Sequence, residues 1–556
     1  MSDPLLGETD EATVPEPDLL VPPHLAGATK PIRRACWWAS AVATLCLSAA
    51  GARADPAAVV TPGPPASDAA PALLGAGTLP SDLSRLLSSA DFGGSVDRLL
   101  RAQVPAQTDG AAASNATSPF GVLSGSWQSP TLLGDMGGVR PALAKYGITL
   151  GILENVETFG NLTGGVQQGF VLNGLTTVTV QVDTQKAFGL NGGLLNASGL
   201  QVWGGDLSAS NLLNMQTVSD IAAPVGIRLW ELWYQQKFSD KLDVKIGQQS
   251  LDEEFILSPS AFFFINSASG WPALPVANLP GGGPAYPLAG LGGRVRAQVT
   301  DNLTLLAGVF NGSPIPRNSP NTPASNPNGV SFPLDTGVLA IAELQYATAG
   351  ASPDASGKSN GPLPGTYKIG AWYDSYAFYD QQYDTMGVPL ASPESNGIAA
   401  SHHGNYSIYA VLDQMVWRSK DDSNRNLSLF LRPMFTPLQD RNPINASLNA
   451  GLNLHGPLPG RDNDIFGLEM GLAHASNGAS GYDRQLQFYQ PTVYTPVRGA
   501  ETFFEATYLW QILPAVQLQP DMQYIINPGA GIANPEEPTQ KLKNEFVIGL
   551  RTNLTF

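Results

Sequence analysis

Charged side chains are scarce in this chain, and their scarcity limits the protein classes to which it can belong. Asp, Glu, Lys and Arg make up 14% of the 556 residues, whereas about 25% is usual for a soluble globular protein. Acidic residues outnumber basic ones, so the formal net charge is −16, and no basic run is present along which phosphates could lie. This balance argues against a nucleic-acid partner.

Cysteine is nearly absent. The two cysteines, Cys36 and Cys46, both lie in an N-terminal segment with the features of a signal peptide. A mature chain without them has no disulfide, no thiolate nucleophile and no cysteine-ligated zinc. His402-His403 has no third ligand at metal spacing in the sequence. We therefore expect neither a metal centre nor a cofactor.

Long apolar runs are also missing, with one exception. Residues 35–50 form an apolar stretch of roughly 16 residues, preceded by Arg33-Arg34 and followed by the cleavage-site pattern Ala52-Arg53-Ala54. Residues 1–54 are thus predicted to be a long leader with a cleaved signal peptide; the alternative is a single membrane anchor, for which the run is short. Because no other run of about 18 apolar residues occurs, a membrane protein of this sequence would have to cross as a closed β-barrel.

The composition changes twice after the leader. Residues 55–118 are low in complexity, with short helical patterns within 80–103, and they are predicted to be a linker containing one or two short helices. Residues 119–556 are predicted to form the barrel domain.

Glycine and proline are abundant, with 59 and 46 residues, which is typical of many strands separated by turns. From Trp127 onward we expect a short helix ending near Tyr146, capped by Asp135, and then strands to the end of the chain. About sixteen are expected, an even number, as in bacterial barrels. The fold class is therefore predicted to be all-β, a transmembrane antiparallel β-barrel. The expected strands are 148–158, 169–183, 198–207, 226–238, 242–250, 291–300, 303–312, 334–347, 365–379, 403–417, 426–437, 444–456, 464–474, 500–510, 513–526 and 543–556.

The alternation of apolar and polar residues is clearest beside the tight turns expected at 238–242 and 300–303. Leu242, Val244 and Ile246 share one face of the strand that follows the first turn. Such a pattern fits apolar side chains that face lipid and polar ones that face a pore, but periodicity alone does not assign the faces.

The last strand indicates which face is outside. Phe546, Ile548, Leu550, Leu554 and Phe556 share one face, with Thr552 the one polar member. A terminal Phe on such a strand resembles the recognition signal of outer-membrane barrels. We therefore expect Phe556 to lie in an aromatic girdle at the periplasmic interface and to be recognised by the outer-membrane assembly machinery.

Several blocks resemble the carbohydrate-selective porins of the OprB type, over roughly Trp127 to Phe556. The resemblance implies a barrel of sixteen strands in the outer membrane of a Gram-negative bacterium, passing glucose and other small sugars. It leaves a monomer and a homotrimer open. The blocks are Leu133-Gly134-Asp135-Met136-Gly137-Gly138-Val139-Arg140 with Tyr146-Gly147-Ile148-Thr149; Leu229-Trp230-Glu231-Leu232-Trp233-Tyr234-Gln235-Gln236 with Lys245-Ile246-Gly247-Gln248; Asp252-Glu253-Glu254-Phe255 with Phe264-Ile265-Asn266 and Gly270-Trp271-Pro272; and residues 518–529.

Residues of the strand at 226–238 are candidates for a pore constriction. One face carries Glu231 and Trp233 and is more polar than the face that carries Trp230 and Leu232, so we expect it to line the lumen. Carboxylates suit sugar hydroxyls, and Trp suits the apolar face of a sugar ring. The alternative is that Trp233 belongs to a girdle and Glu231 to a structural ion pair.

A second set of candidates combines arginines with acids. Arg294 and Arg296 lie two residues apart on one face, and inside a barrel they would project into the pore together. They need compensating carboxylates, which Asp252, Glu253 and Glu254 could supply. We therefore expect an opposed acid and base lining.

The segment 251–290 is long for a connection between strands, and long loops are usually functional or disordered. We expect it to fold into the barrel and narrow it; an extracellular loop over the rim is the alternative. Three other functions stay open, namely a general diffusion porin, an outer-membrane enzyme, for which no catalytic motif is evident, and a structural barrel that tethers the envelope through residues 55–118.

Overall fold

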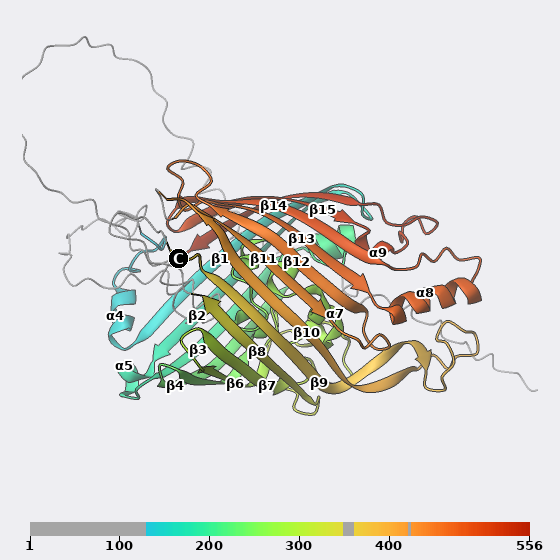
Figure 1. Cartoon of the computed structure of the whole chain (residues 1–556), viewed down its shortest axis with the longest axis horizontal. Helices are drawn as coiled ribbons and strands as arrows, with labels where there is room; N and C mark the ends of the chain where they lie inside the picture. Colours follow the sequence, from blue (N-terminus) through green and yellow to red (C-terminus); the bar gives the residue numbers. More distant parts are fainter. Residues whose placement is uncertain (1–128, 349–360, 421–423) are drawn as a thin grey trace, which may run out of the picture. The chain divides into compact units, whose positions relative to one another are not determined.

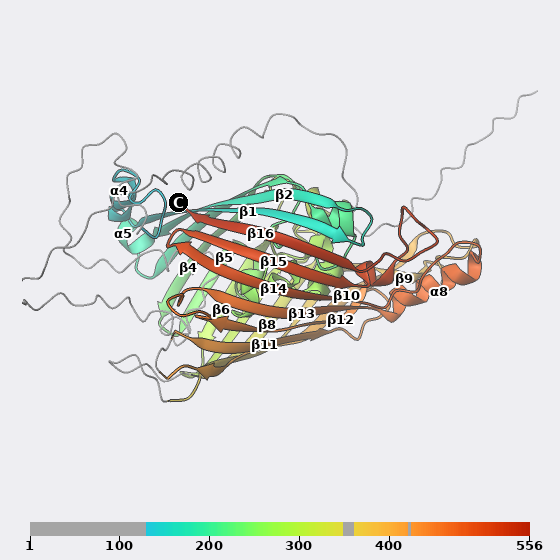
Figure 2. The same cartoon turned by 90° about the horizontal axis from the view of Figure 1, so that it is seen from above.

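Sixteen antiparallel strands close into one barrel, as predicted. The computed structural model describes residues 129–348, 361–420 and 424–556; the predicted leader and linker lie outside these residues. Each strand pairs with its neighbours in sequence (Figure 1), and β16 pairs with β1 to close the sheet (Figure 2). The strands are β1 Ile148–Thr163, β2 Gly169–Asp183, β3 Gly193–Gly204, β4 Gly226–Ser239, β5 Leu242–Gln249, β6 Gly290–Gln298, β7 Leu303–Asn311, β8 Val338–Thr348, β9 Gly365–Asp384, β10 Ala399–Arg418, β11 Asn426–Phe435, β12 Ile444–His455, β13 Ile465–Ala475, β14 Ala500–Leu513, β15 Val516–Ile526 and β16 Glu545–Thr555.

The helices of the described chain are short, and none of them has the length and apolar character needed to span a membrane. The expected helix before β1 is present, but Asp135 does not cap it, because its Oδ1 accepts a hydrogen bond from Gly137 N instead. The helical segments are α4 Val139–Lys145, α5 Thr184–Phe188, η2 Ser208–Leu212, η3 Leu251–Glu253, η4 Ala261–Phe263, α6 Ser267–Gly270, α7 Ala273–Asn278, η5 Pro280–Gly282, η6 Pro323–Ser325, α8 Asn477–Tyr489 and α9 Pro528–Gly531.

The two ends of the barrel differ in their connections. The turns at 240–241, 299–302 and 514–515 are very short and lie at one end, which we call the turn end. Figure 2 places the C-terminus, α4 and α5 at this end and α8 at the other. The other end, called here the loop end, carries long connections that include 205–225 and 250–289.

The outer face is apolar, and aromatic side chains gather near both strand ends. Leu232, Ile246 and Val295 are exposed on neighbouring strands, as the alternation predicted. Exposed aromatic side chains lie toward the loop end (Phe170, Phe435, Tyr524) and toward the turn end (Phe238, Trp417, Trp510). This arrangement fits a lipid-facing band between two aromatic girdles.

The inner wall contains a repeated pairing of glycine with an aromatic ring across adjacent strands. In each pair the ring lies over the glycine, where any side chain would collide with it; a Cβ on Gly471, for example, would lie 2.6 Å from Phe503 Cζ. Glycine thus lets the ring lie against the wall. The pairs are Phe159 with Gly549, Gly292 with Phe310, Gly370 with Tyr409, Phe430 with Gly451, and Gly471 with Phe503.

Candidate functional site

The connection between β5 and β6, residues 250–289, folds into the barrel, as predicted for 251–290. On one wall Lys368 Nζ of β9 donates a hydrogen bond to Leu257 O at 2.8 Å. On another, Gln519 Nε2 of β15 donates to Phe263 O at 3.0 Å. Because β9 and β15 are well separated around the barrel, this segment, called here the inward loop, crosses the lumen and narrows it.

Carboxylates of the wall hold main-chain N–H groups of the inward loop. Glu505 on β14 accepts hydrogen bonds from Ile265 N at 2.7 Å and Asn266 N at 3.0 Å. Glu343 on β8 accepts one from Ile256 N at 2.9 Å. Because these hydrogen bonds go to main-chain N–H groups, they fix the path of the loop independently of its side chains.

Arg432 on β11 is the matching cation and holds main-chain carbonyls. Its guanidinium donates to Ala268 O at 2.6 Å, Ser269 O at 2.8 Å and Gly270 O at 3.1 Å. The side chain is fully buried, and burial of a cation is tolerated only where acceptors surround it. Arg432 therefore fastens the α6 turn of the inward loop to the wall.

A second connection, residues 205–225, also lies inside the barrel. Its Ser219 Oγ donates to Glu157 Oε2 of β1 at 2.5 Å. Glu501 on β14 accepts from the main-chain N–H of Gln216 at 2.8 Å. Sequence reasoning missed this loop, because the strand alternation gives no signal for where a connection folds.

The predicted arginines and acids meet in ion pairs where the inward loop leaves the wall. Arg294 on β6 donates from Nη2 to Glu254 Oε1 at 2.8 Å and also pairs with Asp243 on β5. Lys245 forms a second ion pair with Glu254. Arg296 Nη1 lies 3.6 Å from Asp243 Oδ2. Asp243 is thus a central partner that the sequence analysis did not select, although it lies two residues from Lys245 on the same strand face.

Among the other predicted acids, Asp252 bonds within the inward loop. Its Oδ1 accepts from Ser250 Oγ at 2.5 Å and its Oδ2 from Tyr286 N at 3.1 Å. Burial raises the pKa of Asp252 to about 6 despite these donors. Burial also opposes ionisation of Glu254, but the positive charges of Arg294 and Lys245 prevail and lower its pKa to about 2. Glu253 is buried as well.

Glu231 and Trp233 face the inside of the barrel, as expected for that face of β4. Glu231 Oε1 accepts a hydrogen bond from Ser250 N at 3.0 Å, and Lys245 Nζ lies 4.4 Å from the centre of the Trp233 ring. Trp230, expected on the opposite face with Leu232, is also turned inward and packs against Tyr286 of the inward loop. The cause is a β-bulge, since Ser198 pairs with Glu231 but Gly199 pairs with Leu229.

The two predicted arginines differ in the exposed fraction of their side chains. The Arg294 side chain is only 4% exposed, whereas that of Arg296 is 13% exposed. Arg294 therefore acts on the position of the loop, and Arg296 is the more accessible of the two arginines.

The comparison with known families decides the class of this barrel. The model of the carbohydrate-selective porin, OprB family, matches residues 168–556. The chain belongs to this family. It is an outer-membrane porin.

Individual porins show the same likeness along most of this chain. QuiX of Acinetobacter baylyi, a protein named as a porin, is 25% identical over 447 residues, which cover 76% of this chain and 93% of QuiX. Porin B of Pseudomonas aeruginosa is 22% identical over 449 residues, or 77% of this chain and 92% of Porin B. The high-pH structure of Pseudomonas putida OprB, 22% identical, superposes with a TM-score of 0.66 and covers 77% of this chain and 99% of that one. This structural similarity to Pseudomonas putida OprB supports the barrel fold.

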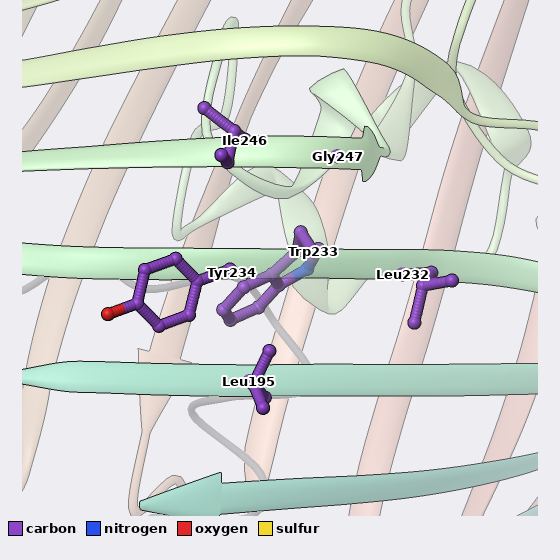
Figure 3. A pocket seen from close by; sticks show the side chains of 6 residues that line it. All are labelled: Leu195, Leu232, Trp233, Tyr234, Ile246 and Gly247. Carbon is purple, nitrogen blue, oxygen red and sulfur yellow. The ribbon is translucent and has the colours of Figure 1, made fainter. Parts of the chain in front are cut away.

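An apolar groove opens on the outer face of this porin, and Trp233 and Tyr234 contribute to its lining. Leu195, Leu232 and Ile246 border it, from three neighbouring strands, and Gly247 lies at its edge (Figure 3). A Cβ on Gly247 would collide with Leu232 O of β4, so glycine lets the two strands approach closely at the edge of the groove. The three bordering side chains are exposed on the apolar outer face of the barrel, so the groove faces the lipid.

Proposed function

We propose that this porin conducts small, glucose-like sugars by passive diffusion and needs no chemical step. The observation that carries the proposal is the inward loop, held across the lumen by hydrogen bonds from the wall. A pore narrowed in this way brings solutes into contact with lining side chains, which is what selectivity requires. Membership in a carbohydrate-selective family supports the choice of solute.

The lining near the turn end also suits neutral polar solutes. Asn155 Nδ2 donates to Asn553 Oδ1 at 2.6 Å, and Asn553 Nδ2 donates to Gln517 Oε1 at 3.2 Å. Each of these partly exposed amides can both donate and accept, and a sugar hydroxyl does the same. Such a row offers hydrogen bonds without selecting for charge.

The predicted residues take two roles in this proposal. Arg294 and Glu254, with Asp252 and Glu253 beside them, position the inward loop. Glu231, Trp233 and Arg296 are the constriction candidates, Arg296 being the accessible guanidinium that suits sugar hydroxyls.

The orientation and assembly of the porin follow from the same reasoning. Bacterial barrels have short periplasmic turns and longer outer loops, so the loop end is proposed to face the outside. Assembly machinery is proposed to recognise β16, whose Ile548 and Leu550 are exposed on the lipid face, together with Phe556.

Liposome swelling tests the proposal. Purified porin is reconstituted, and swelling rates are compared for glucose, an amino acid of equal size and a disaccharide. Faster entry of glucose than of the amino acid is expected. Equal entry of all small solutes would reduce the function to general diffusion, and an absence of swelling would contradict a transport role.

A further inference from the structure

Phe262 differs from the other aromatic side chains of the inward loop in its exposure. It is 41% exposed, whereas Phe255, Phe264 and Trp271 are buried. Sites for small molecules combine exposed aromatic surface with a few well-placed polar groups. The polar groups of the wall around Phe262 therefore decide what its ring can bind.

The turn that carries Phe262 is fixed to the wall on both sides of this residue. Asn453 Nδ2 on β12 donates a hydrogen bond to Ser260 O at 2.8 Å, and Gln519 Nε2 on β15 donates to Phe263 O at 3.0 Å. Both bonds go to main-chain carbonyls, so they hold the turn whatever side chain stands at position 262.

The neighbouring rings pack onto the wall and leave Phe262 to the lumen. The centres of the Phe263 and Phe264 rings lie 5.1 Å apart, edge to face. Both rings lie against Gly467 of β13, where a Cβ would be 2.8 Å from the Phe264 ring. Phe264 also packs against Phe430 of β11. Phe262 is not part of this cluster, so its ring is available to a solute in the lumen.

Four side-chain amides form a row across the wall toward the turn end, called here the amide row. Gln511, Gln517, Asn553 and Asn155 are register partners on β14, β15, β16 and β1. Gln517 Nε2 donates to Gln511 Oε1 at 2.7 Å, and the other two amides continue the row in the same direction. An amide nitrogen carries two N–H groups, so a donor of the row has a second N–H with which it can bind a solute.

The amide row lies beside the turn of Phe262 along β15. Gln517 and Gln519 share the inner face of this strand two residues apart, which corresponds to about 7 Å. Gln519 holds the carbonyl that follows Phe262 in the chain. The ring and the amides therefore border the same part of the lumen, at a separation that one hexose with its hydroxyls can bridge.

We propose that Phe262 and the amide row form a hexose-binding subsite on the turn-end side of the inward loop. The apolar C–H face of the sugar stacks on the ring, and its hydroxyls exchange hydrogen bonds with the amides. This inference rests on the proposed function. The subsite is distinct from the constriction candidates Glu231 and Arg296, which lie on β4 and β6.

Glucose titration of the reconstituted porin tests the ring. Ion conductance is recorded in planar bilayers while glucose is added, and we compare the glucose concentration that gives half of the sugar-dependent decrease. In Phe262→Ala this concentration should rise about five- to tenfold, the scale of one aromatic contact. Phe262→Tyr keeps a ring and should retain the inhibition by glucose. Val276→Ala is the control, because Val276 is also exposed on the inward loop but has no ring.

The amides are tested separately by Gln517→Leu, which keeps the size of the side chain but removes its hydrogen-bonding groups. We expect a higher half-inhibitory glucose concentration here as well. The matched control is Gln201→Leu, which removes an exposed amide from β3 on the outer face that also carries Leu195. Should Phe262→Ala fail to fold, Gln517→Leu still tests the subsite.

Several outcomes would overturn the inference. Equal inhibition of wild type and Phe262→Ala would exclude the ring, and a loss as large in Phe262→Tyr would exclude stacking as its cause. An amino acid of equal size that inhibits as strongly as glucose would exclude a sugar subsite. Faster swelling with glucose but no decrease in conductance would overturn the subsite alone, whereas equal swelling with glucose and the amino acid would overturn the proposed function itself.

Discussion

Glu254 and Arg294 face each other in a two-point contact at the start of the inward loop. Arg294 Nη2 lies 2.8 Å from Glu254 Oε1, and Arg294 Nε lies 2.5 Å from Glu254 Oε2. The Nη2 contact has hydrogen-bond geometry, the Nε contact adds a close ion pair, and both side chains are almost completely buried. The pair therefore determines the direction in which the loop enters the lumen.

Replacing Arg294 should loosen that entry. In Arg294→Met the carboxylates of Glu254 and Asp243 lose a buried partner, and loss of one side of a buried ion pair costs about 3–5 kcal/mol. We expect a larger and noisier single-channel conductance together with a lower thermal stability. Arg294→Lys keeps the charge without the planar fork and should be intermediate. Wild-type conductance in Arg294→Met would contradict a role in positioning the loop.

Replacing Arg432 should loosen the attachment of the inward loop on its far side. Arg432→Met leaves the carbonyls of Ala268 and Ser269 without their donors, and an unsatisfied buried polar group costs about 1–3 kcal/mol. The expected result is increased conductance, measured in planar bilayers. Arg461→Met is the control, because Arg461 pairs locally with Asp464 away from the loop. Equal conductance in the two variants would show that Arg432 does not hold the loop.

The anchoring of the loop should weaken in strong acid. The folded pKa of Glu254 is about 2, below its ordinary value of 4.5, so the folded porin binds this proton less readily than the unfolded chain does. The carboxylate therefore contributes its full stabilisation above about pH 4.5, and this contribution is lost as the pH falls toward 2. We expect conductance to rise within that window. Glu254→Gln should have the raised conductance already at neutral pH, without the further rise in acid. A wild-type conductance that does not change in acid would refute the assignment.

The pairing of Gly549 with Phe159 should matter for closure of the barrel. A Cβ on Gly549 would lie 2.6 Å from Phe159 Cζ, and overpacking of this kind costs about 1–3 kcal/mol. Gly549→Val should lower the folded fraction in a refolding assay followed by heat-dependent gel migration. Adding Phe159→Ala should restore part of it. Gly499→Val, at a position with no atom near its Cβ, serves as the control.

The strands could be predicted because apolar and polar side chains alternate, residue by residue, along the sequence of each strand. Leu242, Val244 and Ile246 share a face of β5 for the same reason that they alternate in the sequence. The tips of β9 and β10 could not be predicted as well, since both strands run to 20 residues and extend beyond the segments expected at 365–379 and 403–417.

The candidate site was harder to predict because it depends on contacts between distant segments. The arginines and acids of the lining were selected from their types, but Asp243 emerged as a partner only through the register of β5 with β6. Trp230 was assigned to the wrong face because a β-bulge changes the alternation at one residue, and no local pattern marks it. Contacts between the wall and the loop at 205–225 join residues far apart in the sequence, by 286 positions for Met215 with Glu501 and by 62 for Ser219 with Glu157.

The wall holds the inward loop largely by its main chain, and this has a consequence for how such channels change over time. Glu505 and Arg432 bind peptide N–H and carbonyl groups, which every amino acid except proline provides in full. The loop can therefore exchange many of its side chains while it keeps its path. Selection for a new solute can act on those side chains without rebuilding the support that holds them.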